Sequence, residues 1–533
     1  VIENNSEQQE TFAYPMELFL SGFSYRYECE NLCRLFFPYS PVKVEVWDQP
    51  GPPSPGEGPW AWAVIEGGPG AYSYQVTVSD GERALTRQAG APALEEYSMT
   101  DLLYNAFVEL TGNHPAWGML TGIHPVKLLR QYVEEEGLAH FQGHCYVTPP
   151  KAELAHRVLR AQGPAVEALG ENDFSLYVSI PFCPTRCAYC SFVSQDMEHA
   201  KKLMDPYFQL LLEEIEKVAQ VTKDLGLSLV SVYIGGGTPT TLSAQQLSAL
   251  CGKIRQVFDF SRCGEFTVEA GRPDTITQEK LLALREADIS RISINPQSLS
   301  DQVLRNIGRR HTAQDVVEAF HLAQRLGFSN INADLIVGLP GDDLASFRRT
   351  LDGVLQLGAS NVTVHSLAIK RSARLNSPGG DLSAHSNAQE AAAMVDYSIQ
   401  RLTQEGFEPY YLYRQTRMAG NLENTGWAKP GSICRYNIYT MDESNTVIAC
   451  GAGGVSKLKD AFHTRYGCTI TQYIQEQRME RAEQLLANTD LLVGQIAKIV
   501  GYQNPSRFAQ LFRRSTGQSP AAFRAFSHPR EAE

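Results

Sequence analysis

From about residue 176 onward, short apolar runs alternate with longer amphipathic runs. The short runs are rich in β-branched residues, as buried strands are, and they occupy residues 176–180, 229–237, 265–270, 290–298, 331–339 and 361–369. Between them, apolar residues recur with a helical period in residues 207–221, 244–258, 277–289, 312–327 and 344–358. Strand, helix and strand repeated in this order predict parallel strands joined by crossover helices.

The number of strands sets the expected architecture. Six strands are fewer than the eight of a closed (β/α)8 barrel, so we predict an α/β fold built on an open, partial (β/α)6 barrel over residues 170–385. Residues 1–165 mix aromatic, strand-like runs with turn clusters and a helical pattern, which predicts an α+β accessory domain. Residues 386–456 continue as a C-terminal extension of the barrel, and residues 457–533 are expected to be all helical.

Composition and charge narrow the classes of partner. The 533 residues carry a formal net charge of -12, which makes the whole chain a poor electrostatic partner for nucleic acid or an anionic membrane. Residues 457–533 differ, with 11 Lys and Arg against 7 Asp and Glu. No apolar run reaches about 18 residues and the first residues lack a secretory pattern, so we expect no membrane span and a cytoplasmic location. The 11 mostly scattered cysteines also favour a reducing compartment.

The exception to this scatter is the stretch "SIPFCPTRCAYCSF", which holds Cys183, Cys187 and Cys190. A redox pair needs only C-x-x-C and leaves Cys183 unexplained. A structural zinc site needs four ligands, and no second pair lies nearby in the sequence. Three thiolates on one loop can hold three irons of a [4Fe-4S] cluster, which leaves the fourth iron free for another ligand. The loop follows a predicted strand, so it is expected at the mouth of the barrel.

Polar and glycine residues follow the later strands. The run "GGGTPT", residues 235–240, ends the second strand, and its glycines allow the backbone to approach a small charged group. Glu269 ends the third strand, and Gln297 and Asp334 stand at later strand ends. Arg309 lies just beyond a strand and offers a planar fork suited to a carboxylate. These side chains are expected to face the mouth.

The motif C-x3-C-x2-C, with Tyr189 before its last cysteine and a strand before its first, resembles the radical SAM superfamily. The resemblance implies that Cys183, Cys187 and Cys190 hold a [4Fe-4S] cluster. It also implies that the open iron chelates the amino and carboxylate groups of S-adenosylmethionine (SAM). One electron from the cluster then splits SAM and gives a 5'-deoxyadenosyl radical.

Within that superfamily, "LYVSIPFC", "GGGTPT", "VEA", "PQS", "GRRHT" and "ADLIVGLPG" are similar, in order and spacing, to the oxygen-independent coproporphyrinogen III oxidase group. A tyrosine that the group has at one contact position is Leu367 here. The resemblance implies a SAM site made by Tyr177, Gly236, Gly237, Thr238, Glu269, Gln297, Arg309, Asp334, Ile336 and Ala368.

Outside the barrel, "WGMLTGIHPVKL" and "CRYNIY…GAGGVSK" resemble one branch of that group, the HemZ-type coproporphyrinogen dehydrogenases. The branch implies oxidative decarboxylation of coproporphyrinogen III to protoporphyrinogen IX in haem biosynthesis. It also implies a flavodoxin- or ferredoxin-like electron donor and an electron acceptor that the sequence does not identify. A haem-binding, chaperone-like role on the same barrel is the alternative. Basic and aromatic residues in 410–417 and 429–436 are candidates to bind the substrate, or are ordinary core aromatics.

The C-terminal residues follow a different pattern. Helical runs at 493–500 and 505–514, separated by "GYQN", have helix-turn-helix spacing and resemble the second half of an AraC-type DNA-binding domain. The resemblance implies that Ser506, Arg507 and Gln510 enter the major groove. The helices expected before residue 456 are absent, so the first unit is truncated. Three explanations of this truncated segment compete: a fusion that regulates genes, a vestigial or recombined tail, and an assembly error that joins two reading frames. We expect no robust DNA binding, with a transcription regulator as the rival function.

Overall fold

The computed structural model divides the chain into two compact units, Val1–Lys457 and Leu458–Glu533. Among the residues that the structure describes, no helix is both long enough and apolar enough to cross a bilayer. The described residues are 14–23, 25–38, 40–49, 51–68, 70–92, 94–122, 124–132, 134–191, 194–368, 373, 388–415, 418–459, 479, 482–483, 485–487, 489, 491–500, 505–516 and 518–527.

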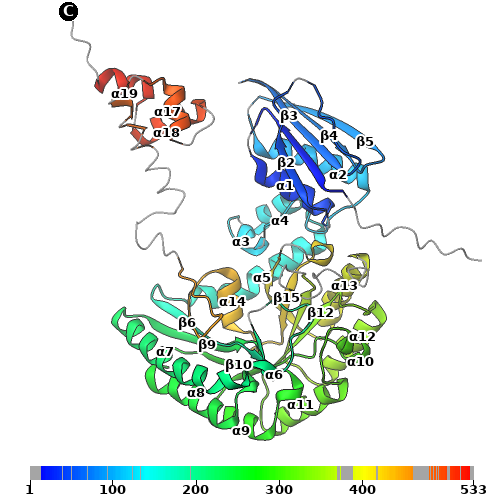
Figure 1. Ribbon diagram of the computed structural model, residues 1–533, viewed down its shortest axis with the longest axis vertical. Coiled ribbons are helices and arrows are strands. Elements are labelled where there is room, and N and C mark those ends of the chain that lie inside the picture. Colours follow the sequence, from blue (N-terminus) through cyan, green and yellow to red (C-terminus); the bar gives the residue numbers. More distant parts are fainter. Residues whose placement is uncertain are drawn as a thin grey trace, which may run out of the picture. The chain divides into compact units, whose positions relative to one another are not determined.

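The first unit begins with a five-stranded sheet (Figure 1). In spatial order its strands are β2 (Val42–Val46), β1 (Met16–Ser21), β3 (Trp60–Gly68), β4 (Ala71–Ser79) and β5 (Ala84–Ala91). β1 runs parallel to β2 and β3, and β3 to β5 form an antiparallel meander. Helices α1 (Arg26–Phe36) and α2 (Glu96–Thr111) share an apolar core with this sheet. α2 ends at Gly112, whose φ of 67° is a left-handed conformation that favours glycine.

Three helices connect this sheet to the rest of the unit: α3 (Pro125–Leu129), α4 (Glu134–Gly143) and α5 (Pro149–Glu167). Their buried side chains, including Phe141 and Val158, belong to the core of the second sheet and not to that of the first. The division of the chain at residues 165 and 385 stays a prediction.

The second sheet has nine strands and contains the six that the sequence predicts. In spatial order they are β14 (Glu408–Tyr413), β15 (Asn424–Ala428), β13 (Asn361–Ser366), β12 (Ile331–Val337), β11 (Arg291–Ile294), β10 (Glu265–Gly271), β9 (Ser228–Gly236), β6 (Asp173–Ile180) and β16 (Thr446–Cys450). β6 to β13 are parallel. The predicted open α/β barrel is therefore confirmed.

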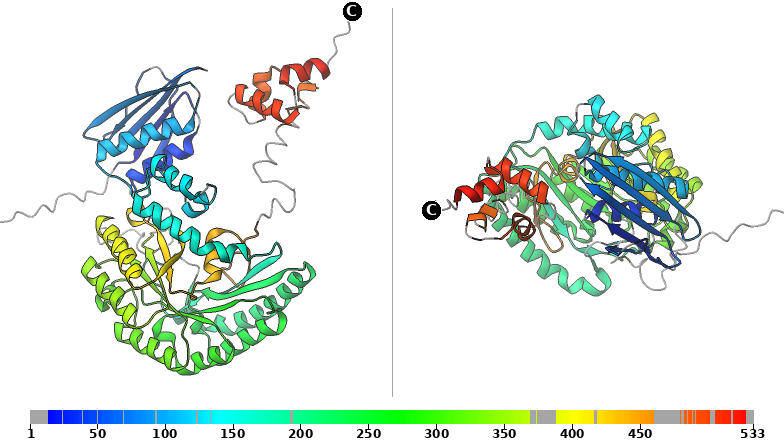
Figure 2. Two further views of the ribbon diagram at one scale, coloured as in Figure 1. Left: turned by 180° about the vertical axis from the view of Figure 1, so that it is seen from behind. Right: turned by 90° about the horizontal axis from the view of Figure 1, so that it is seen from above.

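Helices cover the convex side of this sheet as an outer arc, which Figures 1 and 2 show from two directions. They are α7 (Met204–Asp224), α8 (Ala244–Val257), α9 (Gln278–Glu286), α10 (Asp301–Asn306), α11 (Ala313–Arg325), α12 (Leu344–Gln356) and α13 (Ala388–Gln404). Their starts follow capping rules: Ser243 and Gln246 form a capping box at α8, as Thr312 and Asp315 do at α11. Successive strand residues alternate between this layer and the concave side, so Leu176 and Val178 face the helices.

The sheet has three strands more than the sequence predicts. β16 pairs in parallel with β6, and β15 pairs antiparallel with β13 and carries β14. The former edges of the parallel sheet, β6 and β13, thereby gain partners for backbone groups that an open sheet leaves unpaired. The predicted C-terminal extension is thus part of the barrel sheet itself.

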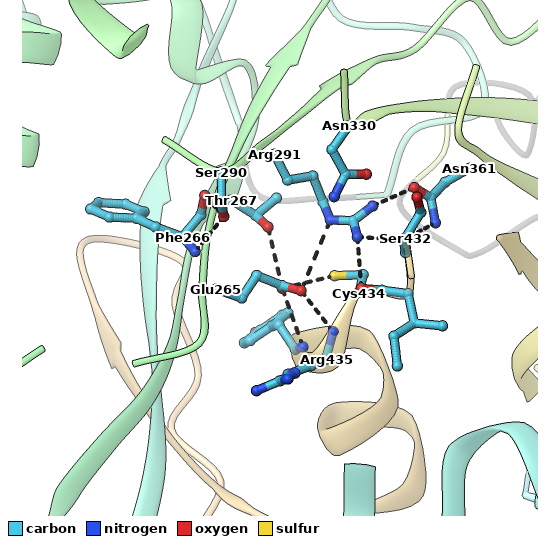
Figure 3. A network of polar contacts seen from close by, with 12 residues as sticks. Glu265, Phe266, Thr267, Ser290, Arg291, Asn330, Asn361, Ser432, Cys434 and Arg435 are labelled. Carbon is cyan, nitrogen blue, oxygen red and sulfur yellow. Dashed lines mark hydrogen bonds and ion pairs between the residues drawn. The ribbon is translucent and has the colours of Figure 1, made fainter. Parts of the chain in front are cut away.

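A helix from this extension lies on the concave side. α14 (Arg435–Asp442) contacts α5, β9 and β14. Its N-terminus is held by Glu265, which accepts hydrogen bonds from the Arg435 amide at 2.8 Å and the Cys434 thiol at 3.2 Å. Arg291 donates to the carbonyls of Ser432 and Ile433, at 2.5 and 2.7 Å (Figure 3). Both charged side chains are buried, and Arg291 Nε lies 3.9 Å from Glu265 Oε2.

The second unit is a small helical core. α17 (Val493–Ile499) and α18 (Pro505–Thr516) agree with the two predicted helices, and α19 (Pro520–Ser527) follows. Ile496, Phe508 and Phe512 are buried together. The segment before them that the sequence assigns to a linker helix lies largely outside the described residues.

A second buried charge network joins α5 to the barrel and generates a stability prediction. Lys151 is 3% exposed and its Nζ lies 2.7 Å from Glu423 Oε1, while Trp117 Nε1 donates to Glu423 Oε2 at 2.7 Å. Lys151→Met leaves the Glu423 charge without its partner, so the free energy of unfolding should fall by about 3–5 kcal/mol.

Urea titration checks this loss. Lys43→Met is the matched control, because its ion pair with Glu17 is exposed and contributes about 0–1 kcal/mol. Equal, small losses for both variants would contradict a structural role for the buried pair.

Candidate functional site at the mouth of the barrel

The cysteine loop starts where β6 ends and is fastened to the glycine run after β9. Gly237 N donates to Ile180 O and Thr238 N to Phe182 O, both at 2.8 Å. β7 (Phe182–Cys183) then pairs with β8 (Gln195–Asp196), which leads into the short helix α6 (Met197–Ala200). The two loops that sequence patterns single out separately are therefore one hydrogen-bonded structure.

Close packing explains the glycine at position 237. A Cβ there would lie 2.6 Å from the Phe182 carbonyl oxygen and 2.9 Å from Cys183 Sγ. Thr238 Oγ1 is 3.6 Å from the same sulfur. Gly236, with φ of +108°, needs the conformational freedom of glycine as well. In this structure the glycines thus make room for the cysteine loop, whereas their approach to SAM stays a prediction.

The rest of the cysteine loop is hydrogen-bonded to the turn after α10. Ala188 N donates to Ile307 O at 3.0 Å, and Thr185 Oγ1 to Gly308 O at 3.2 Å. Cys187 is buried, whereas Cys183 and Cys190 are partly exposed. Tyr189 interacts electrostatically with Cys187 and Cys190. These bonds hold the whole trio over one end of the barrel.

Arg309 lies against this loop. Its Nη1 donates to Asn295 O at 2.8 Å and its Nη2 to the Tyr189 hydroxyl at 3.3 Å. Burial opposes its charge, but Tyr189 and Cys187 raise the pKa of Arg309 above its usual value. A buried guanidinium beside thiolates stabilises their negative charge. Arg309 therefore lies beside a cysteine of the trio. From the sequence we expected its guanidinium to be available to bind the carboxylate of a ligand.

The donor set fits an iron–sulfur cluster. The three cysteines lie on one loop, a missing Cβ at Gly237 leaves space beside Cys183 Sγ, and Arg309 supplies positive charge near Cys187. Among the described residues, no three His, Cys, Asp or Glu side chains converge on one single metal ion. A cluster does not require such convergence, because each thiolate binds an iron of its own.

Two carboxylates on the concave face differ in charge. The Tyr233 hydroxyl donates to Glu269 Oε1 at 2.6 Å, and burial raises the pKa of Glu269 to about 7. Asp334 accepts from Asn332 Nδ2 at 2.8 Å, and its pKa is lowered because hydrogen bonding and charge from His365 outweigh the opposing effect of burial. Near neutral pH Asp334 is therefore ionised, whereas Glu269 is close to the midpoint of its titration.

The backbone of Gln297 is hydrogen-bonded to two other predicted site residues, Asp334 and Ile336. Its φ of 66° is rare for a residue other than glycine, and such strain often marks functional sites. Its backbone N donates to Asp334 O at 2.9 Å, and its O accepts from Ile336 N at 3.1 Å. Its buried side-chain Oε1 has no hydrogen-bond partner among the described residues. The Ile336 side chain packs in an apolar cluster with Leu367, where the family expects a tyrosine.

Tyr177 takes part in an aromatic stack that the sequence did not reveal. Its ring lies 6.2 Å from that of Tyr233 and 6.1 Å from that of Tyr436 on α14, and the last two are 4.5 Å apart. Tyr177 and Tyr233 are partners in the β6–β9 register. Aligning "LYVSI" with "SVYIG" as neighbouring parallel strands places the two tyrosines side by side on the same face, so the sequence could have identified this pair.

Several expected residues lie elsewhere or have structural partners. Ala368 forms an isolated bridge with Met418 beyond β13. Tyr410 and Tyr436 are buried in one apolar cluster, which supports the interpretation of these residues as core aromatics. Arg414 is buried, and its guanidinium donates to the carbonyls of Leu120 and Asn421.

In the second unit, the residues expected to contact DNA all lie on α18. Gln510 is exposed, and the side chains of Ser506 and Arg507 lie outside the described residues. Their role in binding DNA stays a prediction.

Comparisons with known proteins assign the two regions. Residues 177–354 match the radical SAM superfamily and residues 454–525 a helix-turn-helix domain. The chain is 38% identical over 359 residues to the oxygen-independent coproporphyrinogen-III oxidase-like protein HemZ of Bacillus subtilis, covering 66% of this chain and 71% of that protein. It is 32% identical over 291 residues to heme chaperone HemW of the same organism, covering 52% and 70%. The structure of Escherichia coli coproporphyrinogen III oxidase (HemN) is 23% identical, with a TM-score of 0.47 and coverage of 65% and 83%.

The contact between Gly237 and the cysteine loop generates a prediction about cluster binding. Gly237→Ala forces the backbone of Phe182 or the sulfur of Cys183 to move, so affinity for the cluster irons should fall about ten-fold. Iron content and visible absorbance after anaerobic reconstitution measure the loss. Gly252→Ala is the control, because nothing lies within 4 Å of a Cβ at that helical position. Full iron loading of both variants would contradict the proposed geometry.

The raised pKa of Glu269 predicts a pH dependence. The folded protein releases this proton at about pH 7, whereas the unfolded chain releases it near 4.5, the ordinary pKa of a glutamate carboxyl. The contribution of Glu269 to stability therefore decreases as pH rises between these values.

The substitution Glu269→Gln should remove that decrease. Without SAM, the variant should be more stable relative to the wild type at pH 7.5 than at pH 5, which means a larger positive free energy of unfolding. Glu318→Gln, which changes an exposed carboxylate, should show no such trend. If the difference in free energy of unfolding between the wild type and Glu269→Gln were the same at both pH values, the raised pKa of Glu269 would be refuted.

Proposed function

Because the chain belongs to the oxygen-independent coproporphyrinogen-III oxidase-like family of radical SAM proteins, we propose that it oxidatively decarboxylates coproporphyrinogen III to protoporphyrinogen IX. The observation that carries the proposal is the cysteine trio, fastened to the glycine run at Gly237 and faced by Arg309. Radical SAM proteins use a [4Fe-4S] cluster and SAM as cofactors. The role in haem metabolism follows from the relatives, and the particular substrate is the proposed step.

The cysteine loop and the strand ends are the proposed binding sites for the two cofactors. Cys183, Cys187 and Cys190 would hold three irons of the cluster, and the SAM site would lie along the strand ends from Gly236 to Asp334. When bound, the cluster and SAM supply one electron and an organic radical that removes a hydrogen atom from the substrate.

The protein's own side chains set the charge around this site. Arg309 offsets the negative charge of the cysteine loop. Asp334 stays ionised and can bind a hydroxyl or a cation, whereas the protonated carboxyl of Glu269 can donate a hydrogen bond. Gln297 adds a buried amide oxygen with no partner among the described residues, suited to a ligand N–H or O–H. The site therefore offers donors and acceptors that a polar nucleoside-like ligand requires.

The chemical balance implies two further partners. Each reacting propionate loses one hydrogen atom and CO2, and one electron leaves the substrate as the vinyl group forms. We assign delivery of the electron that starts each cycle to a flavodoxin- or ferredoxin-like donor. An electron acceptor must take up the electron that the substrate releases.

The experiment is product analysis with protein reconstituted anaerobically with iron, sulfide and SAM. Incubation with a reductant, an electron acceptor and coproporphyrinogen III should yield 5'-deoxyadenosine, CO2 and vinyl-bearing products. Cys187→Ala should lose the visible absorbance of the cluster and all product. Cys263→Ala, which changes a half-buried cysteine outside the trio, should retain both.

Other outcomes would separate the rival functions. Cleavage of SAM without any tricarboxylate or vinyl product would contradict the proposal. Stoichiometric haem binding and transfer without decarboxylation would favour the activity named for the HemW relative. Binding to a specific DNA that resists competitor DNA would favour a regulator that acts through the second unit.

A further inference from the structure

Two histidines stand one helical turn apart at the end of α4, a segment that the proposed function does not use. His140 lies in the last turn, and the amide of His144 donates to its carbonyl at 2.9 Å, so both side chains emerge on one side of the helix. Their ring centroids are 5.1 Å apart with an interplanar angle of 55°. His144 is exposed and His140 is partly exposed, so solvent reaches both rings.

This separation is the one that a shared metal ion requires. A metal about 2.0–2.1 Å from one nitrogen of each imidazole, with a near-tetrahedral angle between the ligands, places the ring centroids about 5 Å apart. We propose that His140 and His144 form a binding site for a divalent transition-metal ion that prefers imidazole ligands. The rings need little movement to reach the bound arrangement, which limits the entropic cost of binding.

Neighbouring tyrosines orient both rings. The Tyr132 hydroxyl lies 3.1 Å from Nε2 of His140, and the two rings stack at 4.5 Å and 23°. This contact occupies Nε2 and leaves Nδ1 for the metal, as outer partners commonly do for ligating histidines. Tyr97 of α2 donates to the His144 carbonyl at 3.0 Å and meets its ring edge-on at 4.9 Å and 89°.

The type of ligand favours a late transition metal. Imidazole binds a metal in its neutral form, through a ring nitrogen. Cys145, the next residue in the chain, is buried, whereas solvent reaches both histidine rings. Imidazole without thiolate suits Zn²⁺, Ni²⁺ or Cu²⁺ better than Mg²⁺ or Ca²⁺. Among the described residues no third ligand closes the site, so water would fill the open positions.

The site's position suggests what a bound ion does. α4 packs against α5, and Tyr97 belongs to α2 of the first sheet. A metal on His140 and His144 therefore fixes the end of α4 at the junction between α2 and the barrel helices. This role is independent of the reaction at the cysteine loop.

Titration of reconstituted protein with Zn²⁺ and Co²⁺ under anaerobic conditions tests the site, because the cluster then occupies the cysteine trio. His140→Gln and His144→Gln should each weaken binding at least ten-fold and reduce the visible absorption of bound Co²⁺. His114→Gln, which removes an exposed histidine elsewhere in the first unit, should leave the affinity unchanged. Unchanged Zn²⁺ affinity in both test variants would overturn the proposal.

A second variant separates binding from packing. Tyr132→Phe removes the hydroxyl that orients His140 and should weaken Zn²⁺ binding about 10–100-fold. If the histidines only pack against tyrosines, this variant changes stability without changing metal affinity, which contradicts the proposal. The iron of haem offers the same coordination chemistry, so a parallel haemin titration is required. The assignment would also be overturned if the wild type bound no free metal ion and only one of the two histidine substitutions abolished haem binding.

Discussion

A buried ion pair at the N-terminal ends of the parallel strands determines how the open barrel is filled. Glu265 binds the first amides of α14, and Arg291 binds the two carbonyls that precede this helix. Together they fix α14 on the concave side, where Tyr436 completes the stack with Tyr177 and Tyr233. The chain that leaves α14 then returns as β16 beside β6. One pair of opposite charges thus positions both the floor of the lumen and one edge of the sheet.

The opposite end of the strands is organised by backbone hydrogen bonds. The glycine run after β9 is bonded directly to the cysteine loop, and the turn before Arg309 is bonded to it from the other side. Three groups set the charge along the concave face. A guanidinium lies beside Cys187, Glu269 with its raised pKa lies beside Tyr233, and an ionised Asp334 lies beside His365. A site with fixed charges of both signs can hold a zwitterionic cofactor without large rearrangement.

Sequence patterns revealed much of this architecture because its elements are local. The six central strands, their helices and the cysteine trio follow from periodicity and spacing within short windows. β14 and β15 were missed because both are short, and β15, "NTGWA", contains Asn and Gly, which strands disfavour. The run that forms β16 is strand-like in sequence, but its pairing with β6, which lies far earlier in the chain, was not predicted. Arg309 was recognised as a site residue, but its partner Cys187 lies more than 100 positions earlier, and only the tertiary structure joins them. The pairing of Glu265 with Cys434 is non-local in the same way.

The filled lumen constrains where a large substrate can bind. Tyr410 and Tyr436 close the concave side from within, and Arg414 is committed to backbone carbonyls of its own unit. On the proposed function, a flat tetrapyrrole therefore lies above the strand ends, beside the cysteine loop, and cannot enter the lumen. In that arrangement the propionates would meet residues of the rim, and the buried tyrosine stack would not contact the tetrapyrrole.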